Sequence, residues 1–381
     1  MTRDKIHMVD LQRQIDPIRL EINNAIDSVI RDTNFIQGKS VQEFELNLAR
    51  WLGVKYVISC ANGTDALQLA LMALNLKPGD EVIVPSFTYV STAEVIGLLG
   101  LKPILVDVYE DSFNINTLKV EALITERTKA IVPVHLFGQC ANMESIMTLA
   151  KKYKLYVVED TAQSIGAEVL FSDGSVQYAG TIGDIGTTSF FPSKNLGCFG
   201  DGGALITNNE DLAKKLKMIA NHGQNIKYYH DVIGVNSRLD SIQAAVLNVK
   251  LKYLKSYNRS RQKAANYYDQ ALSGINGMLL PYRDNFSTHV FHQYTIRVPM
   301  TDTHCRNGLK VFLLQNQVPS MIYYPLPLHK QRAYANWIEK SNERLPISSL
   351  LSDQVLSIPM HSHLKDEELE LIVDLINQYF N

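Results

Sequence analysis

The first two-thirds of the chain alternates short apolar runs with segments whose apolar residues recur at helical spacing. Residues 55–60 form one such run, and Leu67, Leu71 and Leu74 follow it. A short β-branched run predicts a strand, whereas spacing of three and four predicts a helix. The pattern predicts strands over 55–60, 81–85, 103–107, 129–134, 155–159, 186–191 and 203–207, and helices over 65–76, 92–99, 143–152, 210–221 and 239–251.

This alternation indicates an α/β fold. Strands that are apolar on both faces are typical of a mostly parallel sheet, which helices cover on each side through right-handed crossovers. Ligands of such sheets bind beyond the carboxyl ends of the strands. Polar residues follow several of the predicted strands, so we expect the functional site at that edge.

The pattern changes near residue 255, where we predict a domain boundary. Beyond it the chain predicts a helix over 261–272, a strand over 291–298, a helix over 303–317 and an amphipathic helix from Lys365. Such a mixture is typical of a smaller α+β domain. We therefore predict a large domain over 1–255 and a small C-terminal domain over 256–381.

Composition narrows the possible partners. Apolar residues make up 46% of the chain and charged residues 20%, as in ordinary globular enzymes. A net charge of −2 gives no general attraction to nucleic acid or an anionic membrane. We expect no membrane span, since Lys102 and Pro103 interrupt the nearest candidate, and no secretory signal in the first ten residues. The four cysteines lack metal-binding spacing, so we expect no metal site and reduced thiols in the cytoplasm.

Lys194 and Asp160 are the strongest candidates for chemistry. Lys194 follows Phe190 and Phe191 and precedes a glycine-rich stretch, and a lysine in a partly desolvated turn becomes nucleophilic. Asp160 ends another apolar run. Taken singly, a solvated lysine and an acid that caps a turn are the commoner interpretations. Together the two residues supply the amine and the carboxylate that a cofactor of the pyridoxal phosphate type needs.

Residues 62–65 lie between a predicted strand and a predicted helix. A helix N-terminus at this place offers unpaired N–H groups to a phosphate. An ordinary N-cap by Thr64 would produce the same pattern, so both interpretations stay open. The glycines after Lys194 match neither a dinucleotide fingerprint nor a Walker A loop.

Five segments then carry a resemblance that extends over essentially the whole chain. They are 59–66, 85–90, 159–164, 189–197 and 234–240. In this order they resemble the DegT/DnrJ/EryC1 family of sugar aminotransferases, which have the aspartate aminotransferase fold (fold type I). With Arg238, the stretches 135–141 and 322–329 look closest to enzymes that aminate the 3-keto group of UDP-N-acetylglucosaminuronic acid for bacterial surface polysaccharides.

The resemblance implies pyridoxal 5′-phosphate as the cofactor. It implies a Schiff base to Lys194 and an ion pair between Asp160 and the pyridine nitrogen. The remaining contacts it implies are Gln163 at the ring or its phenolic oxygen, Tyr89 stacked on the ring, Gly63, Thr64, Asp65 and Ser189 at the phosphate, and Asn236 of the partner subunit, also at the phosphate. A homodimer with active sites at its interface follows from the last contact.

The implied substrates are a nucleotide-linked keto sugar and L-glutamate. Arg238 is the candidate for the uronate carboxylate because a guanidinium offers paired hydrogen bonds, although an ion pair with Asp240 or another acid would explain it equally well. Tyr323, Tyr324 and His329 would line the sugar-nucleotide site. Family members often carry histidine at the position of Tyr323, and Tyr324 and His329 are equally interpretable as packing residues.

The implied reaction is a two-stage transamination. Lys194 would move the proton in both stages, first from the donor and then to the sugar. Sugar dehydratases of the same fold replace the Schiff-base lysine by histidine, so Lys194 argues for amination. A sensor or scaffold without enzymatic activity is the other alternative, and retention of the whole catalytic set argues against it.

Overall fold

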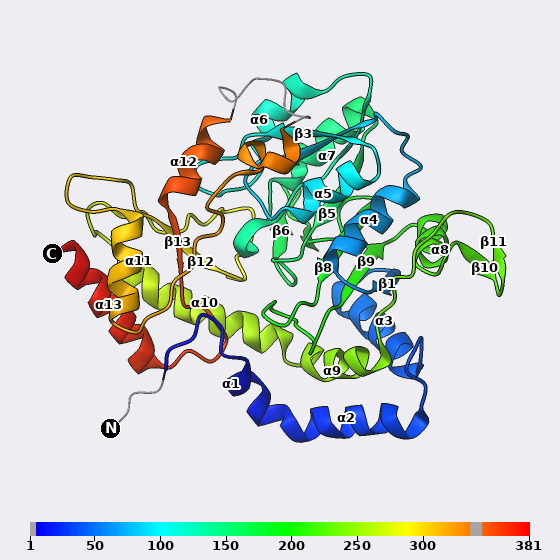
Figure 1. Ribbon diagram of the computed structural model, residues 1–381, viewed down its shortest axis with the longest axis horizontal. Coiled ribbons are helices and arrows are strands. Elements are labelled where there is room, and N and C mark those ends of the chain that lie inside the picture. The colour runs from blue at the N-terminus through cyan, green and yellow to red at the C-terminus, as the bar shows by residue number, and fades with distance from the viewer. Residues whose placement is uncertain (1–4, 336–344) are drawn as a thin grey trace.

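A seven-stranded sheet forms the centre of the larger part of the molecule (Figure 1). In spatial order its strands are β1 (Tyr56–Cys60), β9 (Gly203–Thr207), β8 (Ile185–Ser189), β5 (Tyr156–Asp160), β4 (Thr128–Ile131), β2 (Glu81–Pro85) and β3 (Lys102–Val106). Strand β9 is antiparallel to both of its neighbours, and the four remaining pairs are parallel. The predicted α/β class with a mostly parallel sheet is confirmed.

The computed structural model describes residues 5–335 and 345–381. Residues 1–4, which belong to the N-terminal segment in which we expect no secretory signal, therefore lie outside the described residues. Within the described ranges, no helix combines the length and the apolar character that a bilayer span requires.

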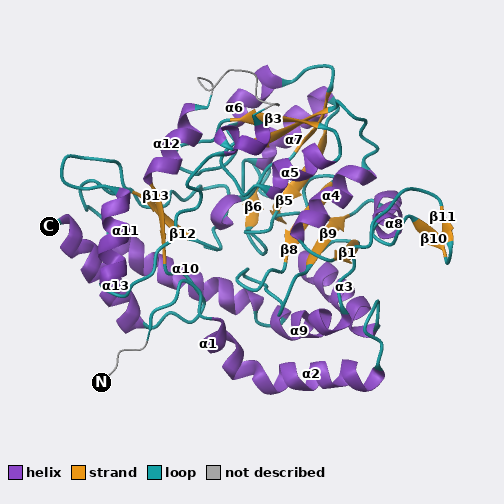
Figure 2. Ribbon diagram, in the orientation of Figure 1, coloured by secondary structure: helices purple, strands orange, loops and turns teal. Residues whose placement is uncertain are grey.

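Helices cover both faces of the sheet (Figure 2). They are α3 (Lys39–Leu52), α4 (Gly63–Ala73), α5 (Ser91–Leu98), α6 (Thr117–Val120), α7 (Met143–Tyr153), α8 (Glu210–Ile219) and α9 (Ser241–Leu251). The helices α1 (Leu11–Ile15) and α2 (Arg19–Asp32) precede them, and α2 packs against α9. Alternation along the strands divides the core: Val82 and Val84 pack with α4, α5 and α8, whereas Ile83 between them packs with α7 on the opposite face. Apolar side chains on both faces explain the near-continuous apolar runs.

The C-terminal part is built from helices and a two-stranded sheet. Its elements are α10 (Leu254–Ala271), α11 (Arg306–Gln315), α12 (Pro346–Gln354), α13 (Asp366–Phe380), β12 (Tyr294–Arg297) and β13 (Val355–Ile358), and the two strands pair antiparallel. Their buried core draws its residues from 264–376 and from Ile6 near the N-terminus. The division into 1–255 and 256–381 stays a prediction, with its boundary at the second residue of α10.

Several elements were not predicted from the sequence. They are the helices α1, α2, α3 and α6, the hairpins β6 (Glu168–Leu170)–β7 (Val176–Tyr178) and β10 (Gln224–Ile226)–β11 (Tyr229–His230), and α12 with β13. Both hairpins carry few buried side chains, so they lack the apolar runs that mark the central strands.

Candidate active site

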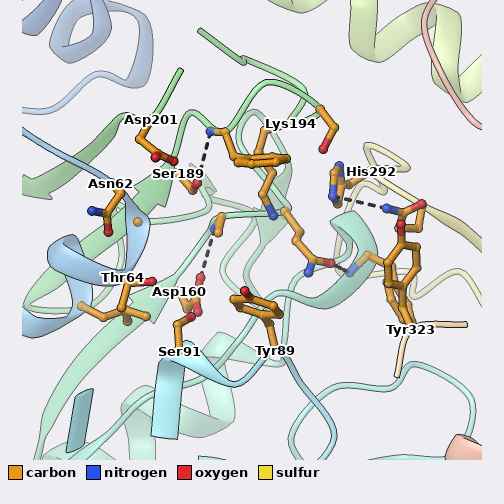
Figure 3. A pocket seen from close by; sticks show the side chains of 18 of the residues that line it. Asn62, Thr64, Tyr89, Ser91, Asp160, Ser189, Lys194, Asp201, His292 and Tyr323 are labelled. Carbon is orange, nitrogen blue, oxygen red and sulfur yellow. Dashed lines mark hydrogen bonds between the residues drawn. The ribbon is translucent and has the colours of Figure 1, made fainter. Parts of the chain in front are cut away.

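A cavity of about 450 Å³ opens at the carboxyl ends of the central strands (Figure 3). Its walls come from the segments after β1, β2, β4, β5 and β8 and from two segments of the C-terminal part. Nine residues predicted from the sequence line it: Gly63, Thr64, Tyr89, Asp160, Gln163, Ser189, Lys194, Tyr323 and Tyr324. The cavity therefore lies at the sheet edge where parallel strands were expected to present a site.

Lys194 lies in a tight loop that leaves the end of β8. The Lys194 N–H donates to the Phe191 carbonyl at 2.8 Å, and the Cys198 N–H closes the loop on the Phe190 carbonyl at 2.8 Å. A Cβ atom at Gly197 would approach the Pro192 carbonyl oxygen to 2.3 Å, so this turn requires glycine. Burial lowers the pKa of the Lys194 amine to about 8, and the negative charge of Asp160 partly opposes this shift. A substantial fraction of the amine is therefore neutral near physiological pH.

Asp160 is held at the last position of β5. Its backbone pairs with the neighbouring strand extension: the Asp160 N–H donates to the Pro133 carbonyl at 2.9 Å, and the His135 N–H donates to the Asp160 carbonyl at 3.0 Å. The carboxylate accepts hydrogen bonds from Thr92 Oγ1 at 2.9 Å and from the Ala162 N–H at 3.1 Å. A buried anion is thus fixed at the floor of the cavity, facing Lys194 (Figure 3).

A fully buried pair supports this strand end from behind. The Glu159 carboxylate lies 3.0 Å from His135 Nε2 and accepts three backbone N–H groups, from Gly180 at 2.9 Å and from Ile182 and Gly183 at 2.7 Å. His135 Nδ1 accepts from the Ala141 N–H, so the imidazole proton is on Nε2 and points at the carboxylate. Both oxygens of the Glu159 carboxylate therefore have hydrogen-bond partners within the fold, and the side chain is not among those that line the cavity.

The N-terminus of α4 forms one wall of the cavity. Asn62 caps the helix by accepting from the Asp65 N–H at 2.8 Å, so the cap is Asn62 and the alternative of a Thr64 cap is wrong. Within the described residues, the N–H groups of Gly63 and Thr64 have no acceptor in the protein. A Cβ atom at Gly63 would lie 2.6 Å from the Ser189 Cβ, so only glycine allows the helix end and β8 to meet. Two open N–H groups and a serine hydroxyl converge there, as in anion sites.

Amide and aromatic groups form the opposite wall. Gln163 accepts from the Phe137 N–H at 2.8 Å and donates to the Tyr324 hydroxyl at 3.1 Å. Because that hydroxyl oxygen accepts, its own proton remains available for a ligand. Burial raises the pKa values of Tyr323 and Tyr324, so both phenols stay protonated. Tyr89 is 55% exposed, with its ring centroid 6.1 Å from that of Tyr324.

Four residues of the predicted set lie outside the cavity lining. His329 is buried between Ser86 Oγ at 2.7 Å and Ser349 Oγ at 3.1 Å, where it joins two segments of the fold. Arg238 lines a separate cavity of about 160 Å³. The other two are Asp65, whose N–H already donates to Asn62, and Asn236, which is exposed.

The cavity also contains residues that the sequence did not single out. Asp201, His292 and Gln293 line it, and Thr92 holds the Asp160 carboxylate. Burial and the charge of Lys194 lower the pKa of His292 well below its ordinary value, so the ring is neutral. His292 and Gln293 precede β12, and nothing in the apolar pattern distinguishes them from other residues at the start of a strand. Thr92 lies two residues after the Tyr89 segment (85–90), and this closeness in sequence was the signal that could have identified it.

These groups fit a phosphorylated aldehyde cofactor. The anion cradle at Gly63, Thr64 and Ser189 suits a phosphate. A lysine of lowered pKa and a buried carboxylate face each other across the space where an aromatic ring would lie. Within the described part of the chain no cluster of His, Cys, Asp or Glu side chains could hold a metal ion.

Comparison with known proteins identifies the family. The model of the DegT/DnrJ/EryC1/StrS aminotransferase family matches residues 16–377. The chain is 44% identical to a UDP-2-acetamido-2-deoxy-3-oxo-D-glucuronate aminotransferase of Pseudomonas aeruginosa, covering 96% of this chain and 98% of the relative. It is 42% identical to a UDP-N-acetyl-3-dehydro-α-D-glucosamine 3-aminotransferase of Acidithiobacillus ferrooxidans, covering 98% and 97%. It is also 42% identical to a pleiotropic regulatory protein of Geobacillus stearothermophilus, covering 98% of each chain.

Solved structures agree with this assignment. A DegT/DnrJ/EryC1/StrS aminotransferase from Brucella abortus superposes with a TM-score of 0.93 at 40% identity, covering 99% of this chain and all of that one. NtdA from Bacillus subtilis, solved with bound cofactor PMP, gives a TM-score of 0.90 at 32% identity, covering 100% and 86%. The chain therefore belongs to the DegT/DnrJ/EryC1/StrS aminotransferase family and is a pyridoxal-phosphate-dependent aminotransferase of fold type I.

Proposed function

We propose that the enzyme transfers the amino group of L-glutamate to the 3-keto group of UDP-N-acetylglucosaminuronic acid, for bacterial surface polysaccharide such as O-antigen or capsule. The observation that carries the proposal is the cavity in which Lys194 and Asp160 face each other beside an anion cradle. Two relatives whose names specify amination of a 3-oxo UDP sugar support the choice of ring position. Amination of another UDP- or dTDP-linked keto sugar, at position 3 or 4, is the alternative, and a dTDP-sugar relative at 40% identity favours it.

The protein's own groups divide the work of such a reaction. Bound pyridoxal 5′-phosphate supplies an electron sink for the charge that develops at the reacting carbon. Gly63, Thr64 and Ser189 hold its phosphate, and Asp160 keeps the ring nitrogen protonated. Lys194 Nζ would take the proton from the donor α-carbon and pass it to the bound cofactor. In the second stage it would take a proton back from the cofactor and deliver it to the sugar carbon. Its lowered pKa suits this exchange because both protonation states are populated near neutral pH.

We further propose a homodimer in which each subunit completes the site of the other. The substrate and L-glutamate carry carboxylates, yet among the described residues that line the main cavity Lys194 is the only lysine or arginine. Arg238 supplies the missing guanidinium if it comes from a second copy of the chain. Exposed apolar side chains in the segment that precedes Arg238 support this interface: Ile226, Tyr228, Tyr229 and Ile233 are 66%, 77%, 69% and 89% exposed. A cluster of this kind on one hairpin and its flank marks an interaction surface.

A cytoplasmic location completes the proposal. All four cysteines are free, and three of them are buried. Unpaired buried thiols suit a reducing compartment, where the sugar nucleotide and L-glutamate are also available.

The test runs the reaction backward. Purified enzyme receives 2-oxoglutarate and, in turn, each member of a panel of UDP- and dTDP-linked amino sugars with and without a C6 carboxylate, and the L-glutamate formed is measured. We expect kcat/KM to be highest for the 3-amino uronate, and Arg238→Gln to remove most of that preference. Lys217→Gln, on the rim of the same small cavity, is the matched control and should not change it.

Three other results of this test would contradict the proposed function. Equal rates with and without the carboxylate would overturn the uronate as the substrate. Faster turnover of a dTDP or 4-amino sugar would favour the alternative substrate. A protein that takes up the cofactor but neither bleaches with L-glutamate nor aminates any sugar would favour a regulatory role, as the name of the Geobacillus relative describes for that protein.

A further inference from the structure

A single buried hydroxyl joins the cofactor cradle to the surface segment that carries Asn236 and Arg238. Ser237 is fully buried, and its Oγ donates to Asp65 Oδ2 at 2.6 Å and accepts from the Ala61 N–H at 3.1 Å. Ala61 lies in the turn between β1 and α4, and Asp65 lies in the first turn of α4. We call this stretch, residues 61–65, the cradle turn, because it also presents the open N–H groups of Gly63 and Thr64. The turn is thus fastened to residue 237 on each side of the capping residue.

The side chains next to Ser237 in sequence point away from the cradle turn. Ser237 and Leu239 are 0% and 1% exposed, whereas Asn236 and Asp240 are exposed and Arg238 is partly exposed. Alternate burial of this kind places successive side chains on opposite sides of an extended segment. The Ser237 N–H donates to the Ala220 carbonyl at 3.0 Å, which fixes the direction of the segment. Side chains 236 and 238 therefore face outward when side chain 237 faces the cradle.

We propose that Ser237 is a positioning residue for two active sites at once. Through Asp65 and Ala61 it holds the phosphate cradle of its own subunit, and through the backbone it sets the direction in which Asn236 and Arg238 reach the site of the partner subunit. This inference rests on the proposed function, since it requires shared sites. It assigns no contact between Ser237 and either substrate or cofactor.

Loss of the Ser237 hydroxyl would leave both of its hydrogen-bond partners unsatisfied. Replacing Ser237 by alanine leaves a partly buried carboxylate without its donor and a backbone N–H without its acceptor. Hydrogen bonds to a charged group are stronger than neutral ones, and an unsatisfied buried partner is costly. The turn and the outward segment then relax independently, so an effect is expected in both sites.

Hybrid dimers separate the two sites. In every hybrid one subunit carries Lys194→Ala, so only the other subunit can bind the cofactor through lysine. The first hybrid adds Ser237→Ala to the subunit that keeps Lys194, and the second adds it to the Lys194→Ala subunit. The readout is the dissociation constant of lysine-bound cofactor, followed by its visible absorption, together with the KM for L-glutamate. We expect about a tenfold weaker retention in each hybrid than in the hybrid with Ser237 in both subunits.

The matched control is Ser241→Ala in the same hybrids. Ser241 is also fully buried, and its Oγ accepts from the Gly38 N–H at 3.1 Å, but it has no contact with the cradle turn in the structure. We expect this variant to leave cofactor retention unchanged. An equal effect of Ser241→Ala, or a change confined to the thermal unfolding midpoint, would reduce Ser237 to an ordinary packing residue and overturn the proposal.

A further hybrid distinguishes failure of the inference from failure of the shared site. It carries Asn236→Ala in the Lys194→Ala subunit. If Asn236→Ala weakens retention at the other subunit's Lys194 and Ser237→Ala does not, the inference about Ser237 is wrong and the shared site stands. If neither substitution acts across the interface, the sites are not shared, and the proposed dimeric site is wrong.

Discussion

The amine of Lys194 is governed by two opposing influences, burial and the charge of Asp160. Burial dominates and brings its pKa down to about 8. Only the neutral amine attacks an aldehyde, so the reactive fraction increases as the pH rises through that value. We expect the rate constant for capture of pyridoxal 5′-phosphate by the cofactor-free protein to increase with pH, to reach half of its maximum near pH 8 and to level off about one pH unit higher. Stopped-flow absorbance measures it, with Lys194→Ala as the blank, and a rate constant that is flat across this range would contradict the lowered pKa.

The role assigned to Asp160 requires the charge of its carboxylate as well as the shape of its side chain. Asparagine has the same outline, but its amide accepts through only one atom, so Asp160→Asn also loses either the Thr92 or the Ala162 hydrogen bond. We expect kcat to decrease by about a hundredfold or more, since removal of a preorganised charge has that magnitude. Single-turnover bleaching with L-glutamate measures the effect, and Thr92→Ser, which keeps the hydroxyl, should change it little. An Asp160→Asn variant as fast as the wild type would remove the assigned role.

The sequence could identify single residues whose role depends on their immediate neighbours along the chain. Lys194 and Asp160 each follow an apolar run and precede a turn, and both line the cavity. His329 does not, because its contacts to Ser86 and Ser349 arise from segments far apart in the chain. His292 went unnoticed for the same reason, since only the tertiary fold brings it beside Lys194.

Elements were predictable where burial alone marks them. The observed bounds of β2 and β9 equal the predicted ranges, and the other central strands differ by a few residues. The direction of β9 was not predictable, because an apolar run reports that both faces are buried and not which way the neighbouring strand runs. Helix α10 begins at Leu254 and not near 261, because polar residues between buried Leu254 and Tyr257 hide its first turns.

The segments that flank β12 and β13 make stability sensitive to acid. Burial lowers the pKa of His289 and of His361 to about 3 and that of His292 well below its ordinary value. Their folded-state pKa values lie below the unfolded value of about 6.5, so the unfolded chain takes up more protons as the pH falls. Stability is complete above about pH 6.5 and decreases below it, by about 1.4 kcal/mol per pH unit for each such histidine.

Urea denaturation at a series of pH values between about 7 and 5 measures this slope. His289→Asn removes one titrating group and should make the slope shallower. The exposed His230 is the matched control, since His230→Asn should leave the slope unchanged. An unfolding free energy that is constant over this range would contradict the burial of the three rings as neutral groups.

For the whole molecule, the exposed hairpin β10–β11 and its flank predict association. Light scattering of the purified protein should give twice the chain mass of 42.9 kDa. Ile233, which is 89% exposed, is the most exposed apolar residue of this surface, and Ile233→Asp should shift the protein toward monomer and weaken cofactor retention together. Leu118→Asp, at a residue on α6 that is 83% exposed and lies outside this surface, should do neither. A monomeric wild-type protein with full activity would exclude the shared site.

The pairing of β1 with β9 also has a consequence for biosynthesis. Tyr56 lies opposite Thr207, so the turn after β1 reaches its place beside Ser189 only once β9 has entered the sheet between β1 and β8. The wall formed by Tyr323 and Tyr324 is translated later still. Contacts this distant in sequence form slowly, and they form after the chain that contains them has emerged from the ribosome. The cofactor site is therefore complete only when almost the whole chain has been translated, and we expect tight binding of pyridoxal 5′-phosphate to begin late in synthesis.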